Sequence, residues 1–252
     1  MIEAVGVVVP ARDEELLLPG CLEALGRARS ALWSRFPVRV HVVVVLDRCS
    51  DGSADAVTRL PGAVAVSIDA GNVGRARAVG ADRVTRLEHG TRPSRVWLAT
   101  TDADSIVPED WLEWQVELAR SGATAVVGTV AVADWSGHQP EVREHWTASY
   151  VAQDRHPHVH GANLGCTLEA YHRAGGFRPL SGDEDVALVA ALGTHGVVRT
   201  AAIPVRTSSR VAPRAAGGFG DHLRRLEESL TTPGGRPQLA AGAGCPNVEN
   251  LR

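Results

Sequence analysis

The feature that most limits the fold of this chain is a run of mostly β-branched apolar residues from Val38 to Leu46. Only Arg39 and His41 interrupt the run, so both faces of the predicted strand would be largely apolar. Strands with one face in water alternate between apolar and polar residues, whereas parallel strands covered on both faces are almost continuously apolar. The run therefore predicts a central strand of a parallel sheet that helices cover on both sides.

Predicted strands and helices alternate around this run. Periodicity predicts strands over 4–9, 63–68 and 95–101, and helices over 14–31, 53–59 and 74–87, because β-branched runs alternate with apolar residues at helical spacing. This order predicts an α/β fold with a doubly wound, mainly parallel, Rossmann-like sheet and right-handed crossovers.

The alternation becomes less regular after residue 104. We predict helices over 109–119, 168–174, 184–192 and 218–230, and strands over 124–133, 161–166 and 197–206. The segment 134–159 is rich in His and Trp with polar residues between them, and we expect it to cross the active-site face rather than enter the core. Residues 231–252 are dominated by Pro, Gly and Ala and are expected to form a flexible tail.

Composition excludes several classes of function. A net charge of -3 argues against a general electrostatic grip on nucleic acid. All 26 basic residues are arginine, which excludes a P-loop lysine or a Schiff-base lysine. The four cysteines form no C-x-x-C pair, and we identify neither a signal-peptide pattern nor an apolar run of the ~20 residues that span a bilayer. We therefore expect a cytoplasmic protein without a transmembrane segment.

Acidic residues follow three of the predicted strands. Glu14 follows the first strand, Asp47 ends the second, and Asp102 and Asp104 follow the fourth. Ligands of open α/β sheets bind at the carboxyl ends of the strands, close to the point where the strand order switches. Because clustered carboxylates repel one another, this arrangement predicts a cation or a donor-rich ligand at that edge.

The Asp102-Ala103-Asp104 segment is the most informative of these acidic sites. Side chains two residues apart in an extended chain point the same way, so both carboxylates could face one Mg²⁺ or Mn²⁺ ion. The alternative interpretation is an Asx-turn or helix cap at Asp104.

Together, these segments resemble the family 2 glycosyltransferases, which have the GT-A fold. The resemblance extends from Val5 to Glu228 and rests on the order and spacing of six segments. They are Pro10-Ala11-Arg12-Asp13-Glu14, with Asp in the place of the family's Asn, Asp47-Arg48-Cys49-Ser50-Asp51-Gly52-Ser53, Asp102-Ala103-Asp104, His160-Gly161-Ala162-Asn163, Gly175-Gly176-Phe177 and Glu184-Asp185-Val186-Ala187-Leu188. It implies one domain over 1–230, with a nucleotide-sugar-binding half to about residue 104 and an acceptor half beyond it.

The resemblance implies a donor site for a UDP- or GDP-linked sugar with a divalent metal, Mg²⁺ or Mn²⁺. Asp104 would ligate the metal, and Asp102 would contact the metal or the ribose. Glu14 and Asp47 would accept hydrogen bonds from the base and the ribose. The remaining donor contacts that it implies are Pro10, Ala11, Arg12, Arg75 and Ala103; Arg75 follows a Gly71-Asn72-Val73-Gly74 turn that could equally be an ordinary glycine-rich turn.

The resemblance also implies a catalytic base at the start of the predicted helix over 184–192. Asp185, beside Glu184, would take the proton from the attacking acceptor hydroxyl, and the reaction would invert the anomeric carbon. The neighbouring Asp183 leaves the register open by a residue or two. The alternative is an acidic helix N-terminus that only satisfies the helix dipole.

Other residues near these segments allow two interpretations each. Arg206, Arg210 and Arg214 could fold over a diphosphate or form a solvated basic loop. His160 or His222 could add a metal ligand, although a single histidine is more often structural. A sugar ring could stack on Trp111, Trp114, Trp135 or Trp146, but at least one of the first two should be core, since they are three residues apart on a helix.

Two other functions remain open at this stage. A sugar-phosphate nucleotidyltransferase would require a glycine-rich basic signature after the first strand, where this chain has Ala11-Arg12-Asp13-Glu14. A non-catalytic nucleotide-sugar-binding protein would have no need to keep all of the acids. The absence of a long basic amphipathic helix favours a soluble or small-molecule acceptor over a lipid.

Overall fold

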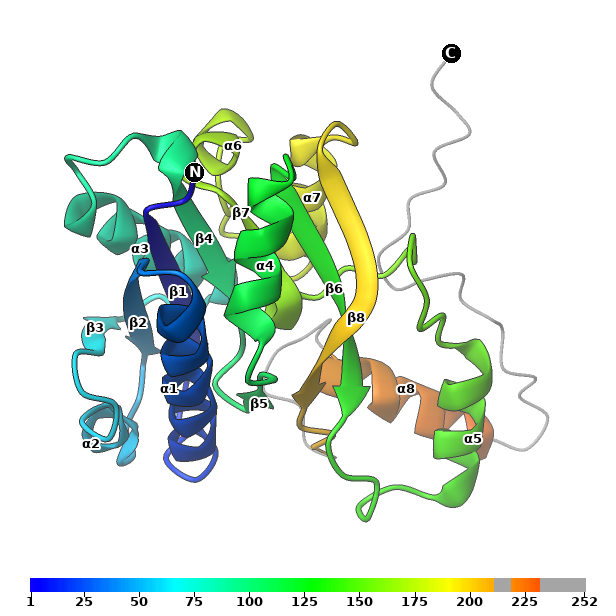
Figure 1. The fold of residues 1–252 in the computed structure, drawn as a ribbon. Coiled ribbons are helices and arrows are strands. Elements are labelled where there is room, and N and C mark those ends of the chain that lie inside the picture. Colours follow the sequence, from blue (N-terminus) through cyan, green and yellow to red (C-terminus); the bar gives the residue numbers. More distant parts are fainter. Residues whose placement is uncertain (211–218, 232–252) are drawn as a thin grey trace.

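The computed structural model describes residues 1–210 and 219–231. Within these residues, the strands form one sheet with the order β3-β2-β1-β4-β7-β6-β8-β5 (Figure 1). The strands are β1 (Ala4–Ala11), β2 (Arg39–Asp47), β3 (Val64–Ile68), β4 (Val96–Thr100), β5 (Ser105–Ile106), β6 (Ala125–Val132), β7 (Leu164–Thr167) and β8 (Val197–Thr207). The helices are α1 (Leu18–Arg35), α2 (Ser53–Val57), α3 (Val73–Leu87), α4 (Trp111–Arg120), α5 (Pro140–Ser149), α6 (Leu168–Arg173), α7 (Glu184–Leu192) and α8 (Phe219–Thr231), with 3-10 turns at Pro93–Arg95 and Gly161–Asn163.

The apolar run over 38–46 forms β2, which helices cover on both faces as predicted. Val42 and Val44 pack in one core cluster with the leucines of α1, whereas Val43 and Val45 pack in the other with α3. In Figure 1, α1 and α4 lie in front of the sheet, and α3 and α7 lie behind it. This two-sided burial is the physical reason why the run has no polar alternation.

Strands β1 to β4 are parallel neighbours, and they determine where the acidic residues lie. Strand β1 pairs with β2 on one side and with β4 on the other. The strand order therefore switches between β1 and β4, because the chain moves outward to β3 before it returns to the other side of β1. Since the two strands are parallel, the residues that follow them meet at one edge of the sheet.

The second half of the sheet contains antiparallel pairs. Strand β7 is antiparallel to both β4 and β6, β8 is parallel to β6, and β5 is antiparallel to β8. The predicted strand over 161–166 begins as a 3-10 turn and becomes extended only at Leu164. The prediction of a mainly parallel sheet is confirmed, with these exceptions.

Two sequence predictions about helices are corrected. The first helix begins at Leu18 rather than at Glu14, because residues 14–17 form a turn in which the Glu14 carbonyl accepts hydrogen bonds from the amides of Leu17 and Leu18. The segment 134–159 contributes to a core that we did not expect. It contains α5, whose buried Val142 and Trp146 pack with Leu223 of α8 near the end of β6 (Figure 1).

Two further points concern the remainder of the chain. The predicted tail lies outside the described residues from position 232 onward. Among the described residues, none of the helices has both the length and the apolar character that crossing a bilayer requires.

Candidate active site

Four carboxylates gather where β1, β4 and α7 approach one another. Glu14 follows β1, Asp102 and Asp104 follow β4, and Glu184 is the first residue of α7. Glu14 and Glu184 are buried, and the two aspartates are partly buried. The parallel pairing of β1 with β4 brings the first three together at the switch point.

Two arginines each bridge two of these four carboxylates, so the cluster keeps an excess of negative charge. The Nη2 atom of Arg210 lies 2.7 Å from both carboxylate oxygens of Glu14 and 2.9 Å from Oδ2 of Asp104. The Nη2 atom of Arg77 lies 2.5 Å from Oδ1 of Asp102, and its Nη1 donates to Oε1 of Glu184. Each guanidinium group therefore bridges two segments that are distant in the sequence.

Asp104 carries an electrostatic penalty in this arrangement. Burial raises the pKa of its carboxyl group to about 6, and the negative charges of Asp102 and Glu14 add to the shift while Arg210 opposes it. Ala103, between the two aspartates, is buried in the core beneath them. A carboxylate in such surroundings is stabilised by a cation.

The first turn of α7 holds the predicted base. Oδ2 of Asp185 accepts a hydrogen bond from the amide of Gly161 at 2.6 Å, and Oδ1 accepts one from the amide of Val186 at 2.8 Å. Burial raises the pKa of the Asp185 carboxyl group, and the positive charge of Arg77 opposes that shift. Asp183, in contrast, is exposed and has a left-handed backbone with a φ of 59°. Of the three acids considered for the base, Glu184 accepts a hydrogen bond from Arg77 and Asp185 accepts one from the Gly161 amide.

Asp47 holds the turn that precedes α3. Its two carboxylate oxygens accept hydrogen bonds from the amides of Ala70, Gly71 and Asn72 at 2.8, 2.8 and 2.7 Å. The side chain of Asn72 then caps α3 by accepting from the amide of Arg75 at 2.8 Å. The predicted turn does open a helix, and Arg75 lies exposed on its first turn.

The loop after β1 is locked against the loop after β2. The amide of Glu14 donates to the Ser53 hydroxyl at 2.7 Å, and the amide of Glu15 donates to Asp51 at 2.9 Å. The other predicted donor contacts in this loop differ in exposure: Ala11 is buried, Pro10 is partly buried and Arg12 is exposed. Carboxylate and thiol ligand atoms of Asp13, Cys49 and Asp51 also lie within 4.8 Å of one another here, a second acidic group that the sequence did not single out.

The principal residue that the sequence missed is Arg77. It lies on the buried face of α3, which otherwise consists of small or apolar residues: Gly74, Ala76, Gly80, Ala81 and Val84. A charged residue in such a stripe was the available signal, because arginine is almost never fully buried without a partner. A Cβ atom at Gly161 would collide with the Arg77 guanidinium, so any larger residue at 161 would displace that group.

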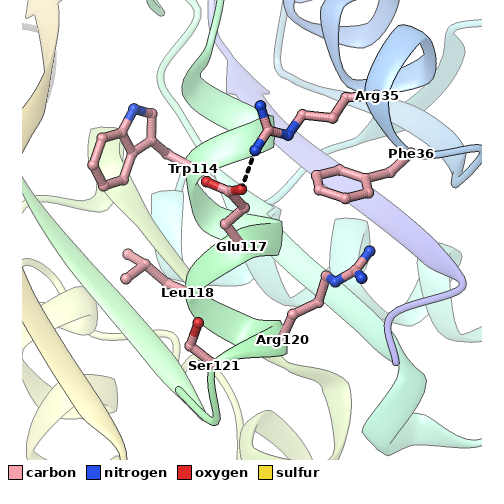
Figure 2. A pocket seen from close by; sticks show the side chains of 7 residues that line it. All are labelled: Arg35, Phe36, Trp114, Glu117, Leu118, Arg120 and Ser121. Carbon is pink, nitrogen blue, oxygen red and sulfur yellow. Dashed lines mark hydrogen bonds and ion pairs between the residues drawn. The ribbon is translucent and has the colours of Figure 1, made fainter.

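The aromatic and histidine predictions have several outcomes. Trp111 is core, as predicted for one of the pair, and its Nε1 donates to Oδ1 of Asn163 at 2.9 Å. Trp114 lines a surface pocket of about 570 Å³ between the ends of α1 and α4 (Figure 2). Trp114 is the one lining residue of that pocket that the sequence singled out as a candidate for stacking on a sugar. His160 lies with its Nε2 3.0 Å from the Tyr150 hydroxyl, whereas Arg214 and the side chain of His222 lie outside the described part of the structure.

Comparison with known proteins assigns the class. An open α/β sheet with acids at its switch point, continued by an antiparallel strand, is the GT-A glycosyltransferase fold, and solved structures with this fold match the chain. The sequence profile of Glycosyl transferase family 2 matches residues 6–178, so the chain belongs to this family. No protein among those curated by function matches the chain.

Three solved structures illustrate the likeness. Residues 1–349 of S. aureus TarS have a TM-score of 0.59 and 12% identity, over 83% of this chain and 61% of that one. Glucosyl-3-phosphoglycerate synthase from Mycobacterium tuberculosis, in complex with Mn²⁺, UDP and glucosyl-3-phosphoglycerate, has a TM-score of 0.54 and 16% identity, over 90% of this chain and 77% of that one. The mannosyltransferase PcManGT from Pyrobaculum calidifontis, in complex with GDP-Man and Mn²⁺, has a TM-score of 0.55 and 22% identity, over 89% of this chain and 60% of that one. At these identities the likeness establishes the fold, and the chain spans about three fifths of the length of the TarS fragment.

Proposed function

We propose that the protein transfers a hexose from a UDP- or GDP-linked sugar to an acceptor hydroxyl, with the help of a divalent metal and with inversion at the anomeric carbon. The observation that carries the proposal is the gathering of Glu14, Asp102 and Asp104 at the switch point, with Glu184 joined to Asp102 through Arg77 and Asp185 next to Glu184 in the chain. Membership of family 2 and solved relatives that hold UDP or GDP-Man with Mn²⁺ support the donor class.

The residues present fit a divalent metal. Carboxylate oxygens suit Mg²⁺ and Mn²⁺, and the Arg210 guanidinium between Glu14 and Asp104 indicates that these acids accept a cation. In this proposal Asp104 is the principal ligand and Asp102 the second, since one oxygen of Asp102 already accepts from Arg77. A bound metal would offset the negative charge that grows on the departing diphosphate.

The donor contacts follow from the same edge of the sheet. Glu14 would accept from the nucleotide once Arg210 moves away from it, and Pro10, Ala11 and Arg12 would lie beside the base. Arg75 and Ala103 would complete the donor side. A carboxylate offers about four lone-pair sites. In Asp47, three backbone amides occupy all but one of these sites. Asp47 would therefore act mainly by holding the turn over 70–72, with one site left for a ribose hydroxyl.

In this proposal Asp185 is the general base. The hydrogen bond from the Gly161 amide orients its carboxylate, and burial raises its pKa from the ordinary aspartate value toward that of a base useful near neutral pH. Glu184 would hold the start of α7 through Arg77. We propose a soluble or small-molecule acceptor and a location in the cytoplasm.

The proposed donor class can be tested by thermal unfolding with UDP, GDP and TDP, each with and without Mn²⁺. We expect one nucleotide to raise the unfolding temperature, and Mn²⁺ to enlarge that increase, because a ligand that binds only the folded state stabilises it. The corresponding nucleotide-sugar should then release nucleoside diphosphate in the presence of an acceptor. The absence of a shift with every nucleotide would contradict the proposal.

A further inference from the structure

Arg77 connects the two sides of the site from a third element. It belongs to α3, whereas Asp102 follows β4 and Glu184 begins α7. Its side chain is only 5% exposed. The guanidinium carbon lies 5.9 Å from the centre of the Phe177 ring, and the missing side chain of Gly161 makes room for the group. Helix, ring and glycine thus hold the cation in a fixed place.

Within that space, two carboxylates orient the guanidinium group through hydrogen bonds. Among the described residues, Nε of Arg77 is buried and has no hydrogen-bond partner. Nη2 donates to Asp102 and Nη1 donates to Glu184. One guanidinium group therefore binds both Asp102, a predicted metal ligand, and Glu184, the residue next to the predicted base. If one carboxylate lost its charge, the planar group would be held more tightly by the other.

A role in stability alone does not account for this arrangement well. Burying a charge is expensive, and a buried ion pair can often be replaced by apolar residues of similar volume without loss of stability. The face of α3 around Arg77 is otherwise small and apolar, and it would accommodate such a residue. The arginine instead lies at the one position of this face where two active-site acids converge.

We propose that Arg77 is a positioning residue that couples the donor side of the site to the acceptor side. It sets the place of Asp102 relative to the start of α7, which carries Asp185, and so makes metal binding depend on Glu184. Arg77 does not touch the reacting atoms. This inference rests on the proposed function, because it takes Asp102 as a metal ligand.

The test is whether a change at Glu184 alters metal binding, and whether that effect passes through Arg77. Mn²⁺ affinity is measured by electron paramagnetic resonance for the protein alone, and then with UDP or GDP. In Glu184→Gln we expect Mn²⁺ to bind about 10-fold more weakly, as when an outer partner of a metal ligand is removed, because Arg77 then holds Asp102 more tightly. In the Arg77→Met background, the same Glu184→Gln change should alter Mn²⁺ affinity by less than about 2-fold, since neutral methionine leaves no path between the acids.

Two controls keep the result interpretable. Arg86→Met removes an exposed arginine from the same helix and should leave both the Mn²⁺ affinity and the Glu184→Gln effect unchanged. If Arg77→Met does not fold, as judged by thermal unfolding, Arg77→Lys replaces it. An ammonium group lacks the planar fork that binds two carboxylates at once. In the Arg77→Lys background, Glu184→Gln should therefore weaken Mn²⁺ binding by less than about 5-fold, compared with about 10-fold in the unmodified background.

The outcomes separate this inference from the proposed function. If the unmodified protein binds neither Mn²⁺ nor a nucleotide, both the proposed function and the inference are overturned. If it binds them but Glu184→Gln has no effect, only the coupling is overturned. The same holds if the effect persists undiminished in Arg77→Met or in Arg77→Lys.

Discussion

The two arginine bridges of the site use the same chemistry in different surroundings. The side chain of Arg77 is 5% exposed and lies on a helix packed within the sheet's second core, whereas that of Arg210 is 22% exposed and follows the last strand. Arg77 is enclosed by Phe177 and Gly161.

This difference indicates what each bridge can do. A guanidinium enclosed by a helix and a ring stays in place when a ligand arrives, so Arg77 can serve as a reference point. Arg210 bridges the two acids proposed for nucleotide and metal, and in the proposed reaction it must give way to them. The comparison therefore predicts that acids beside Arg77 control catalysis, whereas Arg210 controls access of the metal.

The largest effect is expected at Asp185, beside the enclosed bridge. Asp185→Asn should lower the transfer rate by about 10²- to 10⁴-fold, because it removes the proposed general base. Nucleotide binding with Mn²⁺ should change little, since the proposed function places this residue on the acceptor side. Rates with saturating donor and calorimetric binding separate the two quantities. Asp183→Asn, at the exposed neighbour, is the matched control. An equal loss of activity in that variant would contradict the assignment of Asp185 as the base.

The next effect is expected at Asp104, beside the more exposed Arg210 bridge. Asp104→Asn should weaken Mn²⁺ binding by at least about 100-fold, because the principal ligand loses its charge. Unlike Asp185→Asn, it should lower nucleotide affinity only when Mn²⁺ is present. A calorimetric titration with and without Mn²⁺ measures this, and equal nucleotide affinities with and without Mn²⁺ in the unmodified protein would argue against metal assistance.

The sheet and its acidic edge could be predicted from sequence because both depend on local patterns. Continuous valines in β2 required cover on both faces, and the acids directly after β1 and β4 could only lie at the same edge of a parallel sheet. The missed helix boundaries also had a local signal. Proline stands in the first turn of both α1 and α5, where its fixed φ suits a helix start.

The two bridges could not be predicted in the same way. Arg77 lies 25 residues from Asp102 and 107 residues from Glu184 in the chain. Arg210 lies 196 residues from Glu14 and 106 residues from Asp104. No periodicity specifies which acid a given arginine will meet. The role of Asp47 is similar, since its three bonds come from backbone amides of a later turn, and any residue type except proline could supply those amides.

A smaller effect, of opposite sign, is expected at Arg210. Arg210→Gln should strengthen the binding of Mn²⁺ alone by about 3- to 10-fold, because removing a competing, partly exposed ion pair frees Asp104 and Glu14. Electron paramagnetic resonance at several Mn²⁺ concentrations measures the change. Arg206→Gln, at an exposed arginine of β8, should leave Mn²⁺ affinity unaltered. Weaker Mn²⁺ binding in Arg210→Gln would mean that this arginine supports the metal rather than competing with it.

The smallest effect on the site is expected from a third arginine–carboxylate pair, which tests whether such bridges act only locally. Glu88 accepts hydrogen bonds from Arg39, Thr91 and His41, and these hold its pKa at about 2. Because the folded pKa lies below the unfolded value of 4.5, the stabilisation is complete above pH 4.5 and is lost as pH falls toward 2.

The Arg39 side chain is 54% exposed, so solvent screening reduces the contribution to about 1–2 kcal/mol. Urea unfolding at pH 7 and pH 3 should show that the stability difference between the unmodified protein and Glu88→Gln shrinks at the lower pH. Mn²⁺ affinity at pH 7 should be the same in both proteins, because Glu88 caps the C-terminal end of α3, whereas Arg77 lies near its N-terminal end. A change in Mn²⁺ affinity in Glu88→Gln would mean that α3 transmits strain along its length, and Arg77 could then no longer be treated as a fixed reference point.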